Sequence, residues 1–273
     1  MIALLTVAAL LLAGGWLVRR HAPGEVRSTA SAAAHGATIV RYEIRSRHAH
    51  RTLAQTAAIP KHARRRPPLL VFLHGRGAGG EESNSNSSFY EALEHLGDRA
   101  PAVVFPNGGR ASYWHDRAGG DWARYVLDEV IPRAVKRLHA DPRRVAIGGI
   151  SMGGYGAYAI ARRRPSAFCA VGGHSPAIWL SSGESAAGAF DDAEDYDRND
   201  VLALARARGS SPWGDARLWL DGGDEDPFKQ GTHAFVAALG IRATHPSGRH
   251  EGGYWRAHYA RYLRFYADAF EHC

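Results

Sequence analysis

The stretch RVAIGGISMGGYGAYAIARRR, residues 144–164, decides the fold of this 273-residue chain. Residues 145–147 form a short apolar run, which is typical of a strand buried on both faces, and residues 155–164 have the pattern of a helix. Between them, GISMG (149–153) matches G-x-S-x-G, a sharp strand-to-helix turn that exposes a nucleophilic serine. The surrounding glycines leave room for the strand and the helix to approach each other. This stretch therefore predicts Ser151 as a catalytic nucleophile.

The rest of the chain alternates short apolar runs with helical patterns. We expect strands at residues 39–44, 51–57, 69–73, 102–105, 145–147, 168–171, 218–220 and 241–244. We expect helices at residues 89–96, 122–138, 155–164, 201–208, 232–239 and 254–270. This alternation predicts an α/β domain whose mostly parallel central sheet carries helices on both faces. Such sheets bind ligands at the carboxyl ends of their strands, so we expect the chemistry in the loops there.

A serine nucleophile needs a neighbouring base, and His250 has a suitable position for this role. It lies in PSGRHEGG (246–253), a flexible loop between the last predicted strand and the last helix. The acid that orients this base is expected in the loop that follows residues 218–220, which contains Asp221, Asp224, Glu225 and Asp226. We prefer Asp226, because it stands at the start of the next helix, and Asp224 remains the alternative.

A second serine competes for the role of nucleophile. Ser175, in GHSP (173–176), also follows an apolar strand, but no tight helix follows it and the second glycine is missing. The oxyanion hole needs two backbone N–H groups. We expect one from Met152, directly after the nucleophile, and the other from Arg76 in HGRGAGG (74–80).

Several other residues near the predicted strand ends have two interpretations. Aromatic residues that form either a substrate pocket or part of the core are Tyr113, Trp114, Trp179, Trp213 and Trp255. His115 and Asp116 are predicted as solvated loop residues, with binding of a polar substrate as the alternative. Residues 76–88, rich in Gly, Ser and Asn, predict a mobile loop, and the acidic segment 181–200 predicts a solvated excursion, with a small lid as the alternative.

The composition is that of an ordinary globular protein, 45% hydrophobic and 22% charged. The net charge of +7 comes from residues 1–68, which hold 11 Lys and Arg against two Glu, so the remainder carries −2 and no nucleic-acid partner is predicted. Neither zinc-ligand nor EF-hand spacing occurs, and we predict no metal and no cofactor. The two cysteines allow at most one disulfide, but Cys169 lies in an apolar run and is predicted as a buried free thiol.

The chain divides into three parts. Residues 2–18 carry no charge and are followed by Arg19 and Arg20, so residues 1–20 are predicted as a targeting or anchor segment, with a buried helix as the alternative. Residues 21–37, rich in Ala, Ser and Gly, are predicted as a linker and residues 38–273 as the catalytic domain. We expect export or membrane association through the first segment, and a cytoplasmic location stays open.

The chain resembles the α/β-hydrolases of the esterase group that includes esterase D, feruloyl-type esterases and the mycolyltransferases. The stretches that carry the resemblance are LLVFLHGRG (69–77), FPNGGRASYW (105–114), VAIGGISMGGYGA (145–157), DGGDEDPF (221–228) and PSGRHEGGYW (246–255). It covers about residues 38–270 and implies an α/β-hydrolase fold without a large cap domain. Carried over onto matching positions, it implies the triad Ser151, Asp226 and His250, as the residues themselves suggest.

These residues predict a serine esterase that acts on a small-molecule ester through an acyl-enzyme. An acyltransferase would use the same acyl-enzyme with an acceptor other than water. A third hypothesis is a binding protein on a hydrolase fold, which the complete set of Ser, His and Asp disfavours. A peptidase is a fourth and weaker hypothesis.

Overall fold

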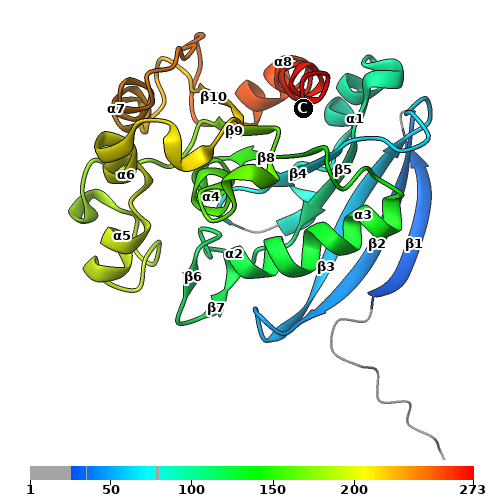
Figure 1. Ribbon diagram of the computed structural model, residues 1–273, viewed down its shortest axis with the longest axis horizontal. Coiled ribbons are helices and arrows are strands. Elements are labelled where there is room, and N and C mark those ends of the chain that lie inside the picture. Colours follow the sequence, from blue (N-terminus) through cyan, green and yellow to red (C-terminus); the bar gives the residue numbers. More distant parts are fainter. Residues whose placement is uncertain (1–25, 35, 78–79) are drawn as a thin grey trace, which may run out of the picture.

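A computed structural model describes residues 26–34, 36–77 and 80–273 of the chain. An eight-stranded sheet with the order β1-β2-β3-β5-β4-β8-β9-β10 forms its centre (Figure 1). The strands are β1 (Val26–Ala34), β2 (Ala37–Ser46), β3 (Arg51–Pro60), β4 (Leu69–Leu73), β5 (Ala102–Pro106), β8 (Val145–Ile150), β9 (Ala170–His174) and β10 (Arg217–Asp221). The strands from β5 to β10 pair in parallel, and β1, β2 and β3 extend the sheet antiparallel. A separate small hairpin consists of β6 (Asp116–Arg117) and β7 (Gly120–Asp121).

Helices cover both faces of this sheet. They are α1 (Ser87–Glu94), α2 (Trp122–Arg124), α3 (Ile131–Leu138), α4 (Met152–Ala161), α5 (Ala193–Asn199), α6 (Val201–Arg208), α7 (Lys229–Leu239) and α8 (Gly252–Phe270). Short 3-10 turns occupy Gly80–Glu82, Gly97–Arg99, Pro165–Ala167, Ser182–Glu184 and Ser211–Trp213. In Figure 1, α1 and α8 lie on one side of the sheet, and α2, α3 and α4 lie on the other. None of the helices in the described part of the chain is both long and apolar enough to span a membrane.

Two hydrophobic cores result from this arrangement. Successive side chains of a strand point to opposite faces, so Leu70 and Phe72 of β4 join α1 and α8, whereas Val71 and Leu73 join the side of α3 and α4. Every residue of β4 is buried, which is why the strand is a continuous apolar run. The predicted fold, a mostly parallel sheet with helices on both faces and no large cap, is confirmed.

Two predicted elements differ from the structure. The predicted helix 122–138 consists of α2 and α3 joined by a π-helical segment, Tyr125–Val130. The predicted strand 241–244 is wrong, because only Thr244 forms an isolated bridge, with Asp221. Pro246 follows two residues later and has no backbone N–H with which to continue the pairing.

Part of the expected linker belongs to the sheet. Within residues 21–37, β1 pairs antiparallel with β2 from Val26↔Ile44 to Ala34↔Ala37. The backbone of β2 supplies its partners, so an edge strand of ordinary linker composition forms there. The predicted targeting segment, residues 1–20, lies outside the described residues.

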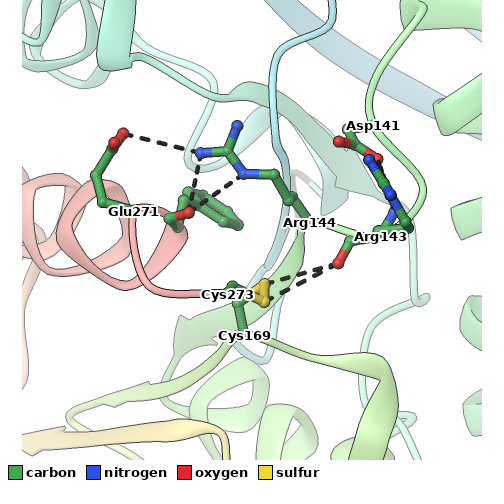
Figure 2. Close-up of a disulfide and its surroundings, with 7 residues drawn as sticks. Asp141, Arg143, Arg144, Cys169, Glu271 and Cys273 are labelled. Atoms are coloured by element: carbon green, nitrogen blue, oxygen red, sulfur yellow. Dashed lines mark hydrogen bonds and ion pairs between the residues drawn. A yellow bond between two sulfur atoms is a disulfide. The ribbon is translucent and has the colours of Figure 1, made fainter.

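The prediction of a free thiol at Cys169 is wrong, because Cys169 and Cys273 form a disulfide (Figure 2). Cys169 directly precedes β9, and Cys273 follows α8 at a sequence separation of 104 residues. Arg144 also holds this end of the helix by donating Nε and Nη2 hydrogen bonds of 3.2 and 2.9 Å to the Phe270 carbonyl oxygen. The end of α8 is therefore fixed to the sheet by a covalent bond and by a cation at the helix C-terminus.

Candidate active site

Ser151 lies on a sharp turn between β8 and α4. Its backbone angles, φ 56° and ψ −115°, are those of a strained residue, and this conformation lifts the side chain above the end of the sheet. The neighbouring glycines are required, because a Cβ at Gly149 would lie 2.5 Å, and one at Gly153 2.3 Å, from the Leu73 carbonyl oxygen. The local sequence thus produces the turn that the pattern predicts.

The structure brings Ser151, His250 and Asp226 together. The Nε2 atom of His250 lies 2.9 Å from the Ser151 Oγ, and its Nδ1 lies 2.9 Å from an Asp226 carboxylate oxygen. The other carboxylate oxygen of Asp226 accepts a 2.8 Å hydrogen bond from the Phe228 amide. Asp226 is buried, and its loop follows β10, as expected. This geometry lets the imidazole accept a proton from the serine while the carboxylate holds the opposite nitrogen.

The alternative acid, Asp224, has a different place. Its carboxylate accepts a 2.9 Å hydrogen bond from the Gly248 amide, and its own amide donates to the Pro246 carbonyl oxygen. Asp224 therefore ties the loop that carries His250 to the loop after β10. Among the described residues, the carboxylate that contacts the His250 ring is that of Asp226.

Ser175 shares the strained backbone of Ser151, with φ 48°, but not its surroundings. Its Oγ accepts a 3.1 Å hydrogen bond from the Trp255 indole. The preceding His174 points into the core, where its ring nitrogens contact Asp221 at 2.8 Å and Tyr266 at 2.9 Å. No histidine of the described chain contacts the Ser175 hydroxyl, so the structure provides no base for it.

The buried Asp221 carboxylate links the elements around the site through hydrogen bonds. It accepts hydrogen bonds from His174, Trp219, Tyr254 and Tyr262. Burial alone would raise the pKa of Asp221, but the hydrogen bonds and charge of its partners, His174 first, hold this pKa below its usual value. The network connects β9, β10 and α8, which carry or flank the loops of the triad.

The two predicted oxyanion donors come from segments that adjoin the nucleophile. Met152 is the first residue of α4, and the first N–H groups of a helix have no partner within the helix. Arg76 follows Gly75, at which a Cβ would lie 3.4 Å from the Ser151 Cβ. The guanidinium of Arg76 is engaged elsewhere and donates a 2.9 Å hydrogen bond to the Ala187 carbonyl oxygen.

His74, which the sequence analysis did not single out, holds the loop of Arg76. Its Nδ1 donates to the Gly75 carbonyl oxygen at 2.7 Å, and its Nε2 accepts from the Gly108 amide at 2.9 Å. Burial lowers the pKa of His74 to about 4, which is consistent with a neutral ring that both donates and accepts. The Trp114 indole donates to the His74 carbonyl oxygen.

A cavity of about 250 Å3 opens at Ser151 and His250. Its lining residues are Gly75, Arg76, Ser83, Asn84, Asn86, Ile150, Ser151, His250, Gly252, Trp255, Arg256 and Tyr259. Asn84, Asn86, Arg256 and Tyr259 were not expected from the sequence. The sequence offered one signal, the two amide side chains of Asn84 and Asn86 just before the predicted helix 89–96. Both lie in the segment 76–88, which was predicted to be a mobile loop.

Of the five aromatic candidates, Trp255 lines this cavity. Four others do not line it and are buried in the core on the α4 side of the sheet: Tyr113, Trp114, Trp179 and Trp213. Tyr113 and Trp179, for example, pack against each other with ring centroids 5.4 Å apart. Their apolar surface is used for packing in the core, one of the two interpretations of these residues.

The acidic segment 181–200 is mostly exposed, as the prediction of a solvated excursion requires, but part of it is a helix with a buried carboxylate. It forms α5, and its Asp195 is buried against His115, with the Nε2 of His115 3.0 Å from the carboxylate. His115 is therefore not a solvated residue, and burial lowers its pKa. Asp191 binds the Arg117 guanidinium, so this segment neutralises a cation of the β6–β7 hairpin.

Within the described residues, no group of His, Cys, Asp or Glu side chains has an arrangement that could hold a metal ion.

Comparisons with known proteins identify the family and the fold. The family model described as "Putative esterase" matches residues 54–258. An S-formylglutathione hydrolase from Agrobacterium tumefaciens has a TM-score of 0.73 at 18% identity, covering 89% of this chain and 99% of its own. A ferulic acid esterase has a TM-score of 0.73 at 21% identity (87% and 100%), and Mycobacterium tuberculosis MPT51 one of 0.66 at 17% (82% and 96%). No curated protein matches in sequence. Because the model covers well over half of the chain and the neighbours share its fold, this protein belongs to the esterase family of α/β-hydrolases.

Proposed function

We propose that this protein is a serine hydrolase that cleaves carboxylic esters of small molecules through an acyl-enzyme. The observation that carries the proposal is the continuous contact from Ser151 through His250 to Asp226, with the serine at the mouth of a cavity. A base placed 2.9 Å from a serine hydroxyl and held by a buried carboxylate is an arrangement suited to acyl transfer.

In the proposed first step, the Ser151 Oγ attacks the ester carbonyl carbon and its proton passes to the Nε2 of His250. The backbone N–H groups of Met152 and Arg76 stabilise the negative charge on the carbonyl oxygen. The imidazolium, stabilised by Asp226, then protonates the leaving alcohol, and the C–O bond breaks to give the acyl-enzyme. Water attacks in the second step, with His250 as base, and releases the acid.

The compartment is part of the proposal. Disulfides form and persist in oxidising environments, and Cys169 is paired with Cys273. The uncharged residues 2–18 followed by two arginines fit an export signal or a membrane anchor. We therefore place the catalytic domain outside the reducing cytoplasm, either released or held at a membrane through residues 1–20.

A series of p-nitrophenyl esters of increasing acyl length, with and without added acceptor alcohols, tests the proposed reaction. We expect release of p-nitrophenol and free acid, and abolition of turnover in Ser151→Ala. Transfer of the acyl group to the alcohol in preference to water would make the protein an acyltransferase. A fluorophosphonate probe should label Ser151, and a label recovered on Ser175 would overturn the assignment.

A further inference from the structure

The charge of the cavity points to a class of substrate. The cationic side chains that line it are those of Arg76 and Arg256, and no carboxylate of the described residues does so. The rest of the polar lining comes from serine, asparagine and tyrosine. A cavity of this kind carries a positive potential next to the reacting serine.

Asn84 lines this cavity and has an unused donor. The residue is only 6% exposed, and its Nδ2 is buried without a hydrogen-bond partner in the described structure. An unpaired buried amide N–H is costly, which makes this group a site for an acceptor on a ligand.

The orientation of this amide follows from its neighbours. The Oδ1 of Asn86 accepts from the Phe89 amide at the start of α1, so its Nδ2 must donate, and it lies 3.4 Å from the Tyr259 hydroxyl. The Tyr259 hydroxyl donates in turn to the Oδ1 of Asn84 at 3.5 Å. With its oxygen occupied, Asn84 has its Nδ2 left as the free donor.

Arg256 supplies the charge. It lies on α8 near its beginning, where a Cβ at Gly252 would be 2.8 Å from the Nη1 of Arg256. No described residue forms an ion pair or hydrogen bond with its guanidinium. Gly252, the first residue of the 19-residue α8, also lines the cavity, and the amino end of a helix favours negative charge.

We propose that the ester cleaved at Ser151 carries an anionic group, a carboxylate or a phosphate, which binds to the Asn84 amide and the Arg256 guanidinium. This inference rests on the proposed function. Both groups are donors, and a planar guanidinium pairs with either anion through two hydrogen bonds. A neutral ester of the same shape would leave the cation without a partner in the cavity.

The test compares esters that differ in one charge. For the leaving group the pair is 4-acetoxybenzoate and its methyl ester, and for the acyl group it is mono-4-nitrophenyl adipate and its methyl ester. We expect kcat/KM to be at least about tenfold higher for the anion in one of the two pairs, since a hydrogen bond to a charged group contributes this much. Arg256→Gln should reduce that ratio to near one. Asn84→Asp, which keeps the acceptor for Tyr259 but replaces the donor by a negative charge, should also reduce it.

Arg264→Gln is the matched control, because it removes the same charge from an exposed position of α8 outside the cavity. It should leave the ratio unchanged. Competitive inhibition by benzoate and by phenyl phosphate separates the two anions, and an inhibitor that loses its effect in Arg256→Gln identifies the preferred one. Equal rates for charged and neutral esters together with no such inhibition would overturn the inference while the esterase stands. No hydrolysis of any ester would overturn the proposed function, and this inference with it.

Discussion

The substitution Asp226→Asn should remove most of the activity, because it changes which nitrogen of the His250 ring carries the hydrogen. In the structure, one carboxylate oxygen of Asp226 accepts from the Phe228 amide at 2.8 Å, and the other faces the Nδ1 of His250 at 2.9 Å. An asparagine has one oxygen and one NH2 group. The NH2 group cannot face the Phe228 N–H, because both are donors, so it must face His250.

This orientation forces the wrong tautomer on the ring. The Nδ1 of His250 must then accept, which leaves the hydrogen on Nε2, the atom 2.9 Å from the Ser151 Oγ. A protonated Nε2 cannot take up the serine proton. The corresponding change in other serine hydrolases lowers kcat about 10⁴-fold, or about 5.4 kcal/mol of transition-state stabilisation.

Asp224→Asn is the control within the same loop. Asp224 accepts a 2.9 Å hydrogen bond from the Gly248 amide, and the oxygen of an asparagine accepts the same bond. We expect less than about a tenfold loss of kcat, since no group of the transition state is touched. The assay is steady-state hydrolysis of p-nitrophenyl acetate, with thermal unfolding to show that both variants fold. A mild effect of Asp226→Asn, or an equal loss in Asp224→Asn, would refute the reasoning.

Three further changes have defined outcomes. Burial lowers the pKa of His74 to about 4 from 6.5, so the unfolded chain binds the proton more readily and the free energy of unfolding should fall by about 3 kcal/mol as pH decreases through this window. Urea unfolding at pH 7 and pH 4.5 checks it, and His74→Gln, which takes up no proton, should lose less. Cys273→Ser opens a loop of about 100 residues and should lower the free energy of unfolding by about 2–5 kcal/mol; a denaturation midpoint equal to that of the unaltered protein would contradict this. Deletion of residues 1–25 should leave kcat/KM unchanged, because the triad and the cavity lie wholly beyond them, and a loss in the purified, folded domain would assign them a role in the site.

The elements that the sequence predicted correctly depend on short-range patterns. The strained turn at Ser151 is imposed by glycines within two residues of it, and β4 is apolar throughout because it is buried on both faces. The order of nucleophile, acid and base along the chain then narrowed fifteen histidines to His250. For the acid, the sequence left two carboxylates open, and only the direction of each side chain separates them.

The type of a residue predicted its location in the fold less well than these short-range patterns did. A tryptophan near a strand end suits a pocket wall and a core equally well. Trp114 is buried in the core, whereas Trp255 lines the cavity. The alanine and serine residues of β1 have the composition of a linker. Because a strand at the edge of a sheet is paired through its backbone, its side chains give little indication of it.

The features that sequence reasoning missed share a physical cause, which is that buried polar groups are satisfied by partners far along the chain. The hydroxyl that fixes Asn84 is 175 residues away, in Tyr259, and the carboxylate that meets His115 is 80 residues away, in Asp195. Each of these groups reads as a loop residue in its own surroundings, because polarity alone indicates solvent. Burial of such a group costs free energy unless the fold supplies a partner, so a group buried without one at a cavity wall is informative. By this reasoning we propose that the free amide of Asn84 bears on which ester is selected, whereas Ser151 bears on the reaction itself.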